Sequence, residues 1–496
     1  MKTPKFIPRY LACAIFAGAA VLPLGAPSAR AQSADEIAQL KAMIEQLQKT
    51  VAEQNARIAE LEKHHPDIAA TTAAAAAVAA NSPSQKTIEK VATGGTVGKA
   101  SQVDNRSALN DQQEAAGRPK DYTLDPNYKG FIPVPNTAVL LKINAKPHVD
   151  MIYDNKNAGN HNRFVPAVFP LQGSSGYSED GEYHMTANAT QIRVDVRAPD
   201  YDDGSFRFYY QNDFFGSGSD TGDMKYRVQH LYGQLRGFKA GFTYGTWEDP
   251  DSWPDTVDYE GPNAVIFSRR PVAQYTQTWS ENWNATYGIE KPDIYVDTAS
   301  GPHAGGSQFT YMPDFGMNIR YEKTGFGHLQ FSGTLRGLGA HDSLGNAHHV
   351  MGWGVNASAV INVGDSVTLQ ALGVVGEGVG GMGNDTSFLN SDAAFNSLGE
   401  LEAMPYWSIH LASTFKWDKK TRSTITYGYV NLDNATGQAA TFYHESTYAS
   451  ANLIWQLRPQ WSLGVEGLYG IMKARNGVDS GDHYRIQLGM VYSIFP

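Results

Sequence analysis

Arginines in this sequence recur at the polar positions of short stretches in which polar and apolar residues alternate. In an extended strand every second side chain faces the same side, so these arginines would share one face of a sheet. The residues placed in this way are Arg193, Arg197, Arg207, Arg227, Arg320 and Arg336. Rings of arginine and lysine are the usual device by which a membrane pore prefers anions. The alternative is that each arginine pairs with an acid across strands and has only a structural role.

A cluster of acids lies in the segment 248–266, with no basic residue before Arg269 and Arg270. Its members are Glu248, Asp249, Asp251, Asp255, Asp258 and Glu260. If this segment folds inward as a constriction loop, its acids would face the arginines and create a transverse field that orients dipolar or anionic solutes. The other interpretation is an external acidic loop that binds a divalent cation or is simply solvated. The sequence leaves both open, and Arg269 and Arg270 join the candidate pore-lining residues.

Motifs for catalysis, cofactors or metals are absent or incomplete in the sequence. There is no G-x-S-x-G motif, and the H-E-x-x-H pattern that begins at His444 has Tyr448 in place of the second histidine. The pair His64 and His65 has no further ligand nearby. A net charge of −10 without a basic patch argues against nucleic-acid binding. We therefore expect a protein that is not an enzyme and has no catalytic residue, cofactor, metal site or nucleic-acid partner.

The elements that must position these side chains are strands. From Thr137 onward we predict sixteen, joined by connections that are alternately long, such as 154–187 and 248–266, and short, such as 199–203 and 280–282. Outer-membrane barrels have long external loops and short periplasmic turns, whereas a soluble sandwich has no reason to alternate in this way. No apolar run after the N-terminus approaches the roughly 20 residues of a membrane helix. We predict an all-β fold, a 16-stranded antiparallel transmembrane β-barrel over 137–496.

The same alternation assigns aromatic side chains to a face of the barrel. Between 204 and 247, most aromatic residues fall on the apolar, outward parity, among them Tyr226, Tyr232, Phe242 and Tyr244, whereas Tyr209 shares the polar parity of Arg207. A sugar-selective porin needs a ladder of aromatic residues along its channel. The predicted outward orientation of most aromatic residues therefore disfavours that alternative function.

The N-terminal third of the sequence has a different character. Residues 1–31 have a basic start, an apolar run that contains Cys13, and an A-x-A pattern, which together predict a secretory signal peptide. Residues 32–63 predict a coiled-coil helix in the periplasm, with the seam Ile37, Leu40, Ile44, Leu47, Val51, Gln54, Ile58 and Leu61. The seam residues by themselves favour a dimer. Residues 64–136 are rich in alanine and poor in core-forming residues, so they predict a low-complexity linker.

Several longer stretches resemble the DcaP-like outer-membrane porins. They are GFIPVPNT at 130–137, VDMIYD at 149–154, RVQHLYG at 227–233, GFTYGTWED at 241–249 and RRP at 269–271. The resemblance covers nearly the whole chain after the signal peptide and is strongest over 128–290. It implies a homotrimer in the lipid bilayer of the bacterial outer membrane, with the coiled coil in the periplasm. It also implies uptake of small organic anions, particularly dicarboxylates and aromatic acids.

The sequence therefore predicts an outer-membrane porin for passive diffusion of small, anionic solutes. One alternative is the sugar-selective porin. Another is a structural protein that tethers layers of the cell envelope, in which the coiled coil is the active part and the barrel is an anchor.

Overall fold

The computed structural model describes residues 130–494, apart from 135–136, 138, 175, 202–203 and 218–223, together with Lys49. The predicted signal peptide, the predicted coiled coil and nearly all of the predicted linker lie outside the described residues, so these remain predictions. Among the described residues, no helix is both long and apolar enough to cross a membrane.

The described residues form strands and short 3-10 helices. The strands are β1 (Ile132–Pro133), β2 (Leu140–Lys146), β3 (His148–Asp154), β4 (Glu182–Thr186), β5 (Gln191–Tyr201), β6 (Gly204–Asp213), β7 (Arg227–Leu235), β8 (Phe238–Tyr244), β9 (Arg269–Thr278), β10 (Trp283–Glu290), β11 (Val296–Asp297), β12 (Ser307–Phe309), β13 (Asp314–Lys323), β14 (Gly327–His341), β15 (Ala347–Val363), β16 (Val367–Glu377), β17 (Ala393–Phe395), β18 (Leu401–Ala403), β19 (Pro405–Lys416), β20 (Thr421–Leu432), β21 (Tyr443–Arg458), β22 (Trp461–Ala474) and β23 (Ser480–Tyr492). The 3-10 helices are η2 (Pro166–Val168), η3 (Pro250–Ser252) and η4 (Gly380–Met382).

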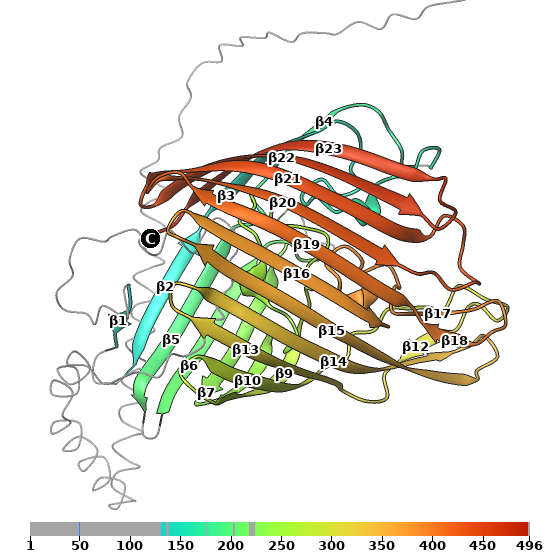
Figure 1. The fold of residues 1–496 in the computed structure, drawn as a ribbon, viewed down its shortest axis with the longest axis horizontal. Coiled ribbons are helices and arrows are strands. Elements are labelled where there is room, and N and C mark those ends of the chain that lie inside the picture. Colours follow the sequence, from blue (N-terminus) through green and yellow to red (C-terminus); the bar gives the residue numbers. More distant parts are fainter. Residues whose placement is uncertain are drawn as a thin grey trace, which may run out of the picture. The chain divides into compact units, whose positions relative to one another are not determined.

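The long strands pair antiparallel with their neighbours along the chain and close into a barrel (Figure 1). The first and last strands meet because β23 pairs with β3, from Arg485 opposite Asp154 to Val491 opposite His148. Closure leaves the strands of the ring without a free edge, so their backbone groups are satisfied within the sheet, as the interior of a membrane requires. The predicted all-β barrel is confirmed.

The two faces of the barrel have the reverse polarity of a water-soluble protein. In β22, the outward Tyr469 is 42% exposed, whereas the inward Glu466, three residues earlier, is 1% exposed. The same contrast holds in β14, where Phe331 is exposed and Ser332 and Arg336 are buried. An apolar outer face and a polar interior are typical of a barrel that stands in lipid.

The predicted outward orientation of Tyr232 and Tyr244 is wrong. Both are buried on the inner side of the barrel. In β7, a register shift opposite Gln211 and Asn212 changes the phase of the strand, so that His230 and Tyr232 turn inward and Leu231 turns outward. In β8, Gly241 has φ of 142°, a conformation that other residues rarely adopt, and Thr243 and Tyr244 follow it inward.

The connections retain the predicted alternation of long and short. The connection between β14 and β15 is shorter than predicted: only 342–346 separates these strands, because their pairing extends to His341 opposite Ala347. Several long connections fill the interior of the barrel. Phe164, Trp247, Ile266 and Met382, each from a connection, belong to one buried cluster together with inward side chains of the strands.

Candidate functional site

The segment 248–266, which we call the inner loop, runs inside the barrel. At its start, the backbone carbonyl of Trp247 accepts hydrogen bonds from Ser332 on β14 (2.7 Å) and Asn356 on β15 (3.0 Å). Asp249 then forms an ion pair with Arg320 on β13 (3.2 Å) and accepts a hydrogen bond from Ser358 on β15 (2.6 Å). The inward polar side chains of these strands therefore hold the loop in the interior.

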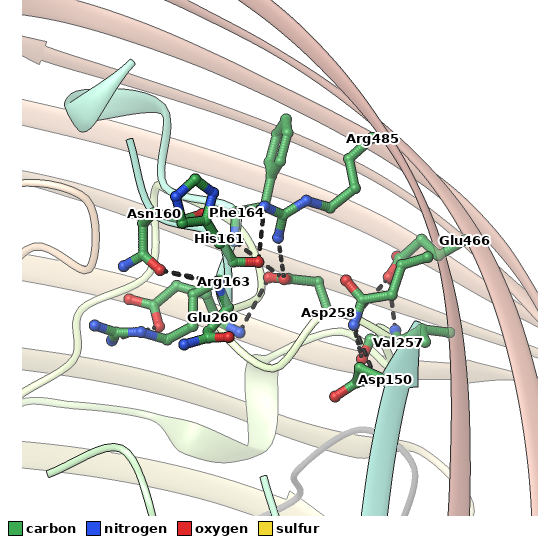
Figure 2. A network of polar contacts seen from close by, with 12 residues as sticks. Asp150, Asn160, His161, Arg163, Phe164, Val257, Asp258, Glu260, Glu466 and Arg485 are labelled. Atoms are coloured by element: carbon green, nitrogen blue, oxygen red, sulfur yellow. Dashed lines mark hydrogen bonds and ion pairs between the residues drawn. The ribbon is translucent and has the colours of Figure 1, made fainter. Parts of the chain in front are cut away.

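The inner loop continues along the inner faces of the last strands. Asp255 forms an ion pair with Arg422 on β20. The backbone amides of Val257 and Asp258 both donate hydrogen bonds to Glu466 on β22, each at 2.7 Å (Figure 2). The loop thus contacts strands from β13 round to β23, whose inner faces we call the anchoring wall.

A second connection, 155–181, joins β3 to β4 and contacts the inner loop. Arg163 forms an ion pair with Glu260 at 2.9 Å, and the backbone amide of Phe164 donates to Asp258 at 3.1 Å (Figure 2). Arg485 on β23 lies 3.6 Å from the same Asp258 carboxylate. These contacts fix the middle of the inner loop.

Tyr259 connects the inner loop to the opposite side of the barrel. Its hydroxyl donates a hydrogen bond to Asp213 on β6 (2.8 Å) and accepts one from Gln191 on β5 (3.2 Å). It also contacts Gln229 on β7. The loop therefore crosses the interior from the anchoring wall to the inner faces of β5–β9, which we call the cavity wall.

The six predicted loop acids are all brought inside the barrel, and five of them pair with basic side chains. Asp249 and Asp251 pair with Arg320, Asp255 with Arg422, Asp258 with Arg485, and Glu260 with Arg163. Each of these bases lies on the anchoring wall or in the connection 155–181. Asp258 and Glu260 also lie beside Arg227 and Arg269 of the cavity wall, around one small cavity. The acids that face this wall therefore have basic partners of their own and do not form a row of uncompensated charges.

Glu248 and Asp249 are adjacent in sequence but differ in ionisation. Burial raises the pKa of Glu248 to about 8, and the charge of Arg270 only partly offsets this. Burial also acts on Asp249, but its hydrogen bond with His328 and the charge of Arg320 lower its pKa to about 2. At neutral pH, Glu248 is therefore largely protonated and Asp249 is ionised.

Three of the predicted arginines are held in ion pairs that leave little or none of the side chain exposed. Arg270 contacts Glu290 (3.0 Å) and Asp314 (2.8 Å) and is fully buried. Arg336 contacts Asp314 and Asp392, each at 3.0 Å, and is also fully buried. Arg320, which holds the inner loop, is 10% exposed. These side chains are positioned to support the structure rather than to meet a solute.

Two of the four arginines of β5–β7 are more exposed, Arg197 (27%) and Arg227 (26%), whereas Arg207 (11%) and Arg193 are nearly buried. Arg197 and Arg207 share Asp195, at 2.7 and 2.9 Å, and Arg227 contacts Asp213 at 2.6 Å. Arg193 donates a hydrogen bond to Gln191 at 2.8 Å. The structure therefore brings these four predicted residues together on the cavity wall.

Arg269 differs from all the others. Among the described residues, no acid forms an ion pair with it, although its neighbour in sequence, Arg270, has two. Its guanidinium lies over the ring of Phe267 at 4.7 Å and that of Tyr244 at 5.9 Å. A cation over an aromatic face is stabilised without being neutralised, so its charge stays available to an anion.

Aromatic side chains extend along the cavity wall next to these cations. Tyr209 contacts Tyr232 with ring centres 5.6 Å apart, His230 contacts Tyr244 at 4.9 Å, and Tyr244 contacts Trp253 of the inner loop at 5.3 Å. Arginine and aromatic side chains therefore alternate along one side of the interior.

A small cavity of about 70 Å³ lies between the inner loop and the cavity wall. Among its lining residues are Gln191, Arg227, Tyr244, Arg269, Trp253, Tyr259 and Phe267. A water molecule needs about 10–15 Å³ of such space, so only a few waters fit at once. Asp258 and Glu260 line it as well. A solute in this cavity, which we call the passage, would therefore touch cations, paired acids and aromatic rings.

Sequence reasoning missed several of these residues. Arg422 and Arg485 lie on the inward parity of predicted strands, so the rule that selected the other arginines could have found them. Tyr232 and Tyr244 were assigned to the wrong face, because neither a bulge nor the conformation of Gly241 is visible in a simple alternation. No sequence signal links Tyr259 to Asp213.

A closed barrel with an apolar outer face, a polar interior and an inward-folded loop defines an outer-membrane channel protein. The family model of the DcaP outer membrane protein matches residues 100–493, and the chain belongs to this family. The resemblance found in the sequence is thus confirmed, and the protein is located in the bacterial outer membrane.

The fold resembles that of a solved channel. The crystal structure of the outer membrane channel DcaP of Acinetobacter baumannii is 21% identical and has a TM-score of 0.61, over 72% of this chain and 97% of that one. The anion-selective porin from Comamonas acidovorans is 12% identical, with a TM-score of 0.46 over 72% and 100% of the two chains. No curated protein sequence matches the chain.

Proposed function

We propose that this channel passes small organic anions, including dicarboxylates and aromatic acids, by passive diffusion. The observation that carries the proposal is Arg269, which lines the passage with no acidic partner among the described residues. Arg227 lines the same passage and remains 26% exposed beside its partner Asp213. An anion that enters this space meets positive charge on the cavity wall.

The inner loop is also compatible with a preference for anions, because basic side chains outside the cavity wall compensate its negative charge. Its ionised acids pair with bases of the anchoring wall and of the connection 155–181. Glu248, with its raised pKa, is largely uncharged at neutral pH. The narrow part of the passage is therefore positive, even though the whole chain carries a net negative charge.

The inner aromatic residues give the sugar-selective alternative some support. Sugars stack on open aromatic faces, and Tyr209, Tyr232 and Tyr244 face inward. However, Arg207 lies over Tyr209 at 4.7 Å, Lys239 over Tyr232 at 5.2 Å, and Arg269 over Tyr244. Cations cover these rings, so the wall suits an anion, above all an aromatic one, better than a neutral sugar.

The architecture that we propose for the membrane is a trimer of sixteen-stranded barrels. If β2 with β3, and β4 with β5, each count as one crossing, the ring of pairings supports sixteen crossings. The trimer, the coiled coil at 32–63 and its periplasmic position rest on the heptads and on the resemblance to the family. Cross-linking of the native membrane protein, with and without residues 32–63, measures the number of copies.

The proposal is tested by the ion selectivity of Arg269→Gln in a planar bilayer under a salt gradient. A unit charge at 4 Å contributes about 1 kcal/mol in water, which corresponds to about a fivefold change in relative anion permeability. We expect the reversal potential to move toward cation preference by this amount, and further in the double variant with Arg227→Gln.

Arg458→Gln is the matched control, because Arg458 is exposed at the end of β21, away from the passage. It should leave the reversal potential unchanged. A native channel that prefers cations, or a double variant with native selectivity, would contradict the proposal.

A further inference from the structure

Two histidines and a glutamate gather where the connection 155–181 meets the barrel. The Nδ1 atom of His161 lies 3.2 Å from Oε2 of Glu182, and the Nε2 atom of His184 lies 3.4 Å from the same oxygen. A carboxylate oxygen of Asp154 lies within 4.8 Å of ligand nitrogens of both histidines. Side chains from two strands and one connection thus converge on one point.

The strands place three of these residues by simple geometry. Asp154 on β3 is the antiparallel partner of Glu182 on β4, and His184 follows Glu182 by two residues. Because strand side chains alternate, Glu182 and His184 share the inward face, while Tyr183 between them is exposed.

Arg485 brings the fourth residue to the cluster. It donates hydrogen bonds to the backbone carbonyls of Asn160 (3.0 Å) and His161 (3.3 Å) (Figure 2). It also holds Asp154 through two hydrogen bonds. The backbone beside His161 is therefore fixed against the same strand pair that carries Glu182 and His184.

We propose that His161, His184 and Glu182 bind a divalent transition-metal ion of borderline softness, such as Zn²⁺, with Asp154 next to it. Two imidazoles and one carboxylate are a common set of ligands for such ions, whereas Ca²⁺ and Mg²⁺ prefer oxygen ligands. The hydrogen-bonding partners of Asp154, which are Arg485 and His483, orient its carboxylate beside the site.

The environment of His161 supports this assignment. Its Nδ1 atom is buried and makes no hydrogen bond with any described residue, although Glu182 is so close. Its ring stacks on that of His184 with centres 4.0 Å apart, an arrangement that suits neutral imidazoles.

The sequence predicted no metal site because the ligands follow no motif. They lie at positions 161, 182 and 184, and only the fold of the connection 155–181, held by Arg485, brings the first to the other two. A site here would link the connection 155–181 to β4, and that connection in turn contacts the inner loop through Arg163 and Phe164.

The test is equilibrium binding of Zn²⁺ to the full-length, untagged channel in detergent after removal of bound metals. All proteins should carry His64→Ala and His65→Ala, so that the tail contributes no ligand. We expect one Zn²⁺ per chain, and at least a tenfold loss of affinity in His184→Ala and in His161→Ala, since even outer-shell changes cost about 10–100-fold. Ca²⁺ should not compete.

His349→Ala is the matched control, since His349 lies outside the cluster and contacts Phe309 and Tyr311. It should bind Zn²⁺ like the parent protein. Glu182→Gln keeps the shape of the side chain, so it separates the loss of a metal ligand from the loss of folding. We expect this variant also to bind Zn²⁺ more weakly. The proposal would be overturned if Zn²⁺ did not bind stoichiometrically, or if its affinity were unchanged in both histidine variants. The cluster would then be only a contact between two imidazoles and a carboxylate.

Discussion

Arg320 on the anchoring wall and Arg269 on the cavity wall use the same residue type in opposite ways. On the anchoring wall, Arg320 is 10% exposed and contacts two acids of the inner loop. On the cavity wall, Arg269 has no acidic partner among the described residues and lies over aromatic rings. What lies opposite each arginine therefore decides whether it holds the structure or remains available to a solute.

The difference has an energetic basis. A buried ion pair compensates the cost of removing two charges from water only as long as both partners remain, so removal of one leaves an uncompensated charge. A cation over a ring keeps its net charge, and its removal leaves no unpaired acid. A change at Arg320 should therefore affect stability, and a change at Arg269 should affect selectivity.

The largest expected effect is that of Arg320→Ala. It leaves Asp249 and Asp251 buried without their base, which costs about 3–5 kcal/mol for a buried pair. We expect lower thermal stability and, because the start of the inner loop is released, a larger single-channel conductance. Arg458→Ala serves as the exposed control. A variant with native melting temperature and native conductance would show that Arg320 does not hold the loop.

A second, smaller effect is a pH dependence of the protein's stability that comes from protonation of Glu248. Its pKa of about 8 in the folded protein exceeds the ordinary glutamate value of 4.5, so the folded state binds more protons than the unfolded state between these values. Its contribution to stability is therefore fully present below pH 4.5 and is lost as pH rises to 8, by about 1.4 kcal/mol per pH unit. Glu248→Gln resembles the neutral form and should remove this slope.

The measurement compares thermal unfolding of the two proteins between pH 5 and 9. The difference in stability, Glu248→Gln minus native, should grow with pH up to about 8 and then level off. The contributions of the other titrating groups are the same in both proteins and cancel in this difference. If the variant is instead less stable than the native protein by a constant amount, Glu248 is ionised and pairs with Arg270.

The sequence was sufficient for the barrel because its constraints are local and repeated. Alternation and connection lengths are visible in a single chain, and the polar parity correctly selected arginines that face inward, such as Arg193 and Arg336. The partners of those arginines were not predictable. Arg336 depends on Asp392, which lies in a distant connection, and Arg320 depends on the path of the inner loop.

The errors on the cavity wall have a common cause. Parity reasoning assumes an unbroken strand, whereas the register shift in β7 and the backbone at Gly241 each change the phase. Tyr232 and Tyr244 consequently face the interior, and alternation in the sequence could not predict that these two rings would lie there. The resemblance to a family could indicate organic anions, but it could not indicate which rings would meet them.

The smallest expected effect concerns Phe267, the ring nearest to Arg269. Phe267→Leu keeps an apolar side chain but removes an aromatic face on which an aromatic solute can stack, a contact worth about 0.5–1.5 kcal/mol, or about two- to twelvefold in solute affinity. We expect benzoate to block the current less well in this variant, whereas block by acetate should change little. Phe238→Leu is the control, because Phe238 is 65% exposed on the outer face. Equal losses for both solutes would mean that Phe267 only positions Arg269, and that the aromatic rings of the cavity wall support the cation rather than select the solute.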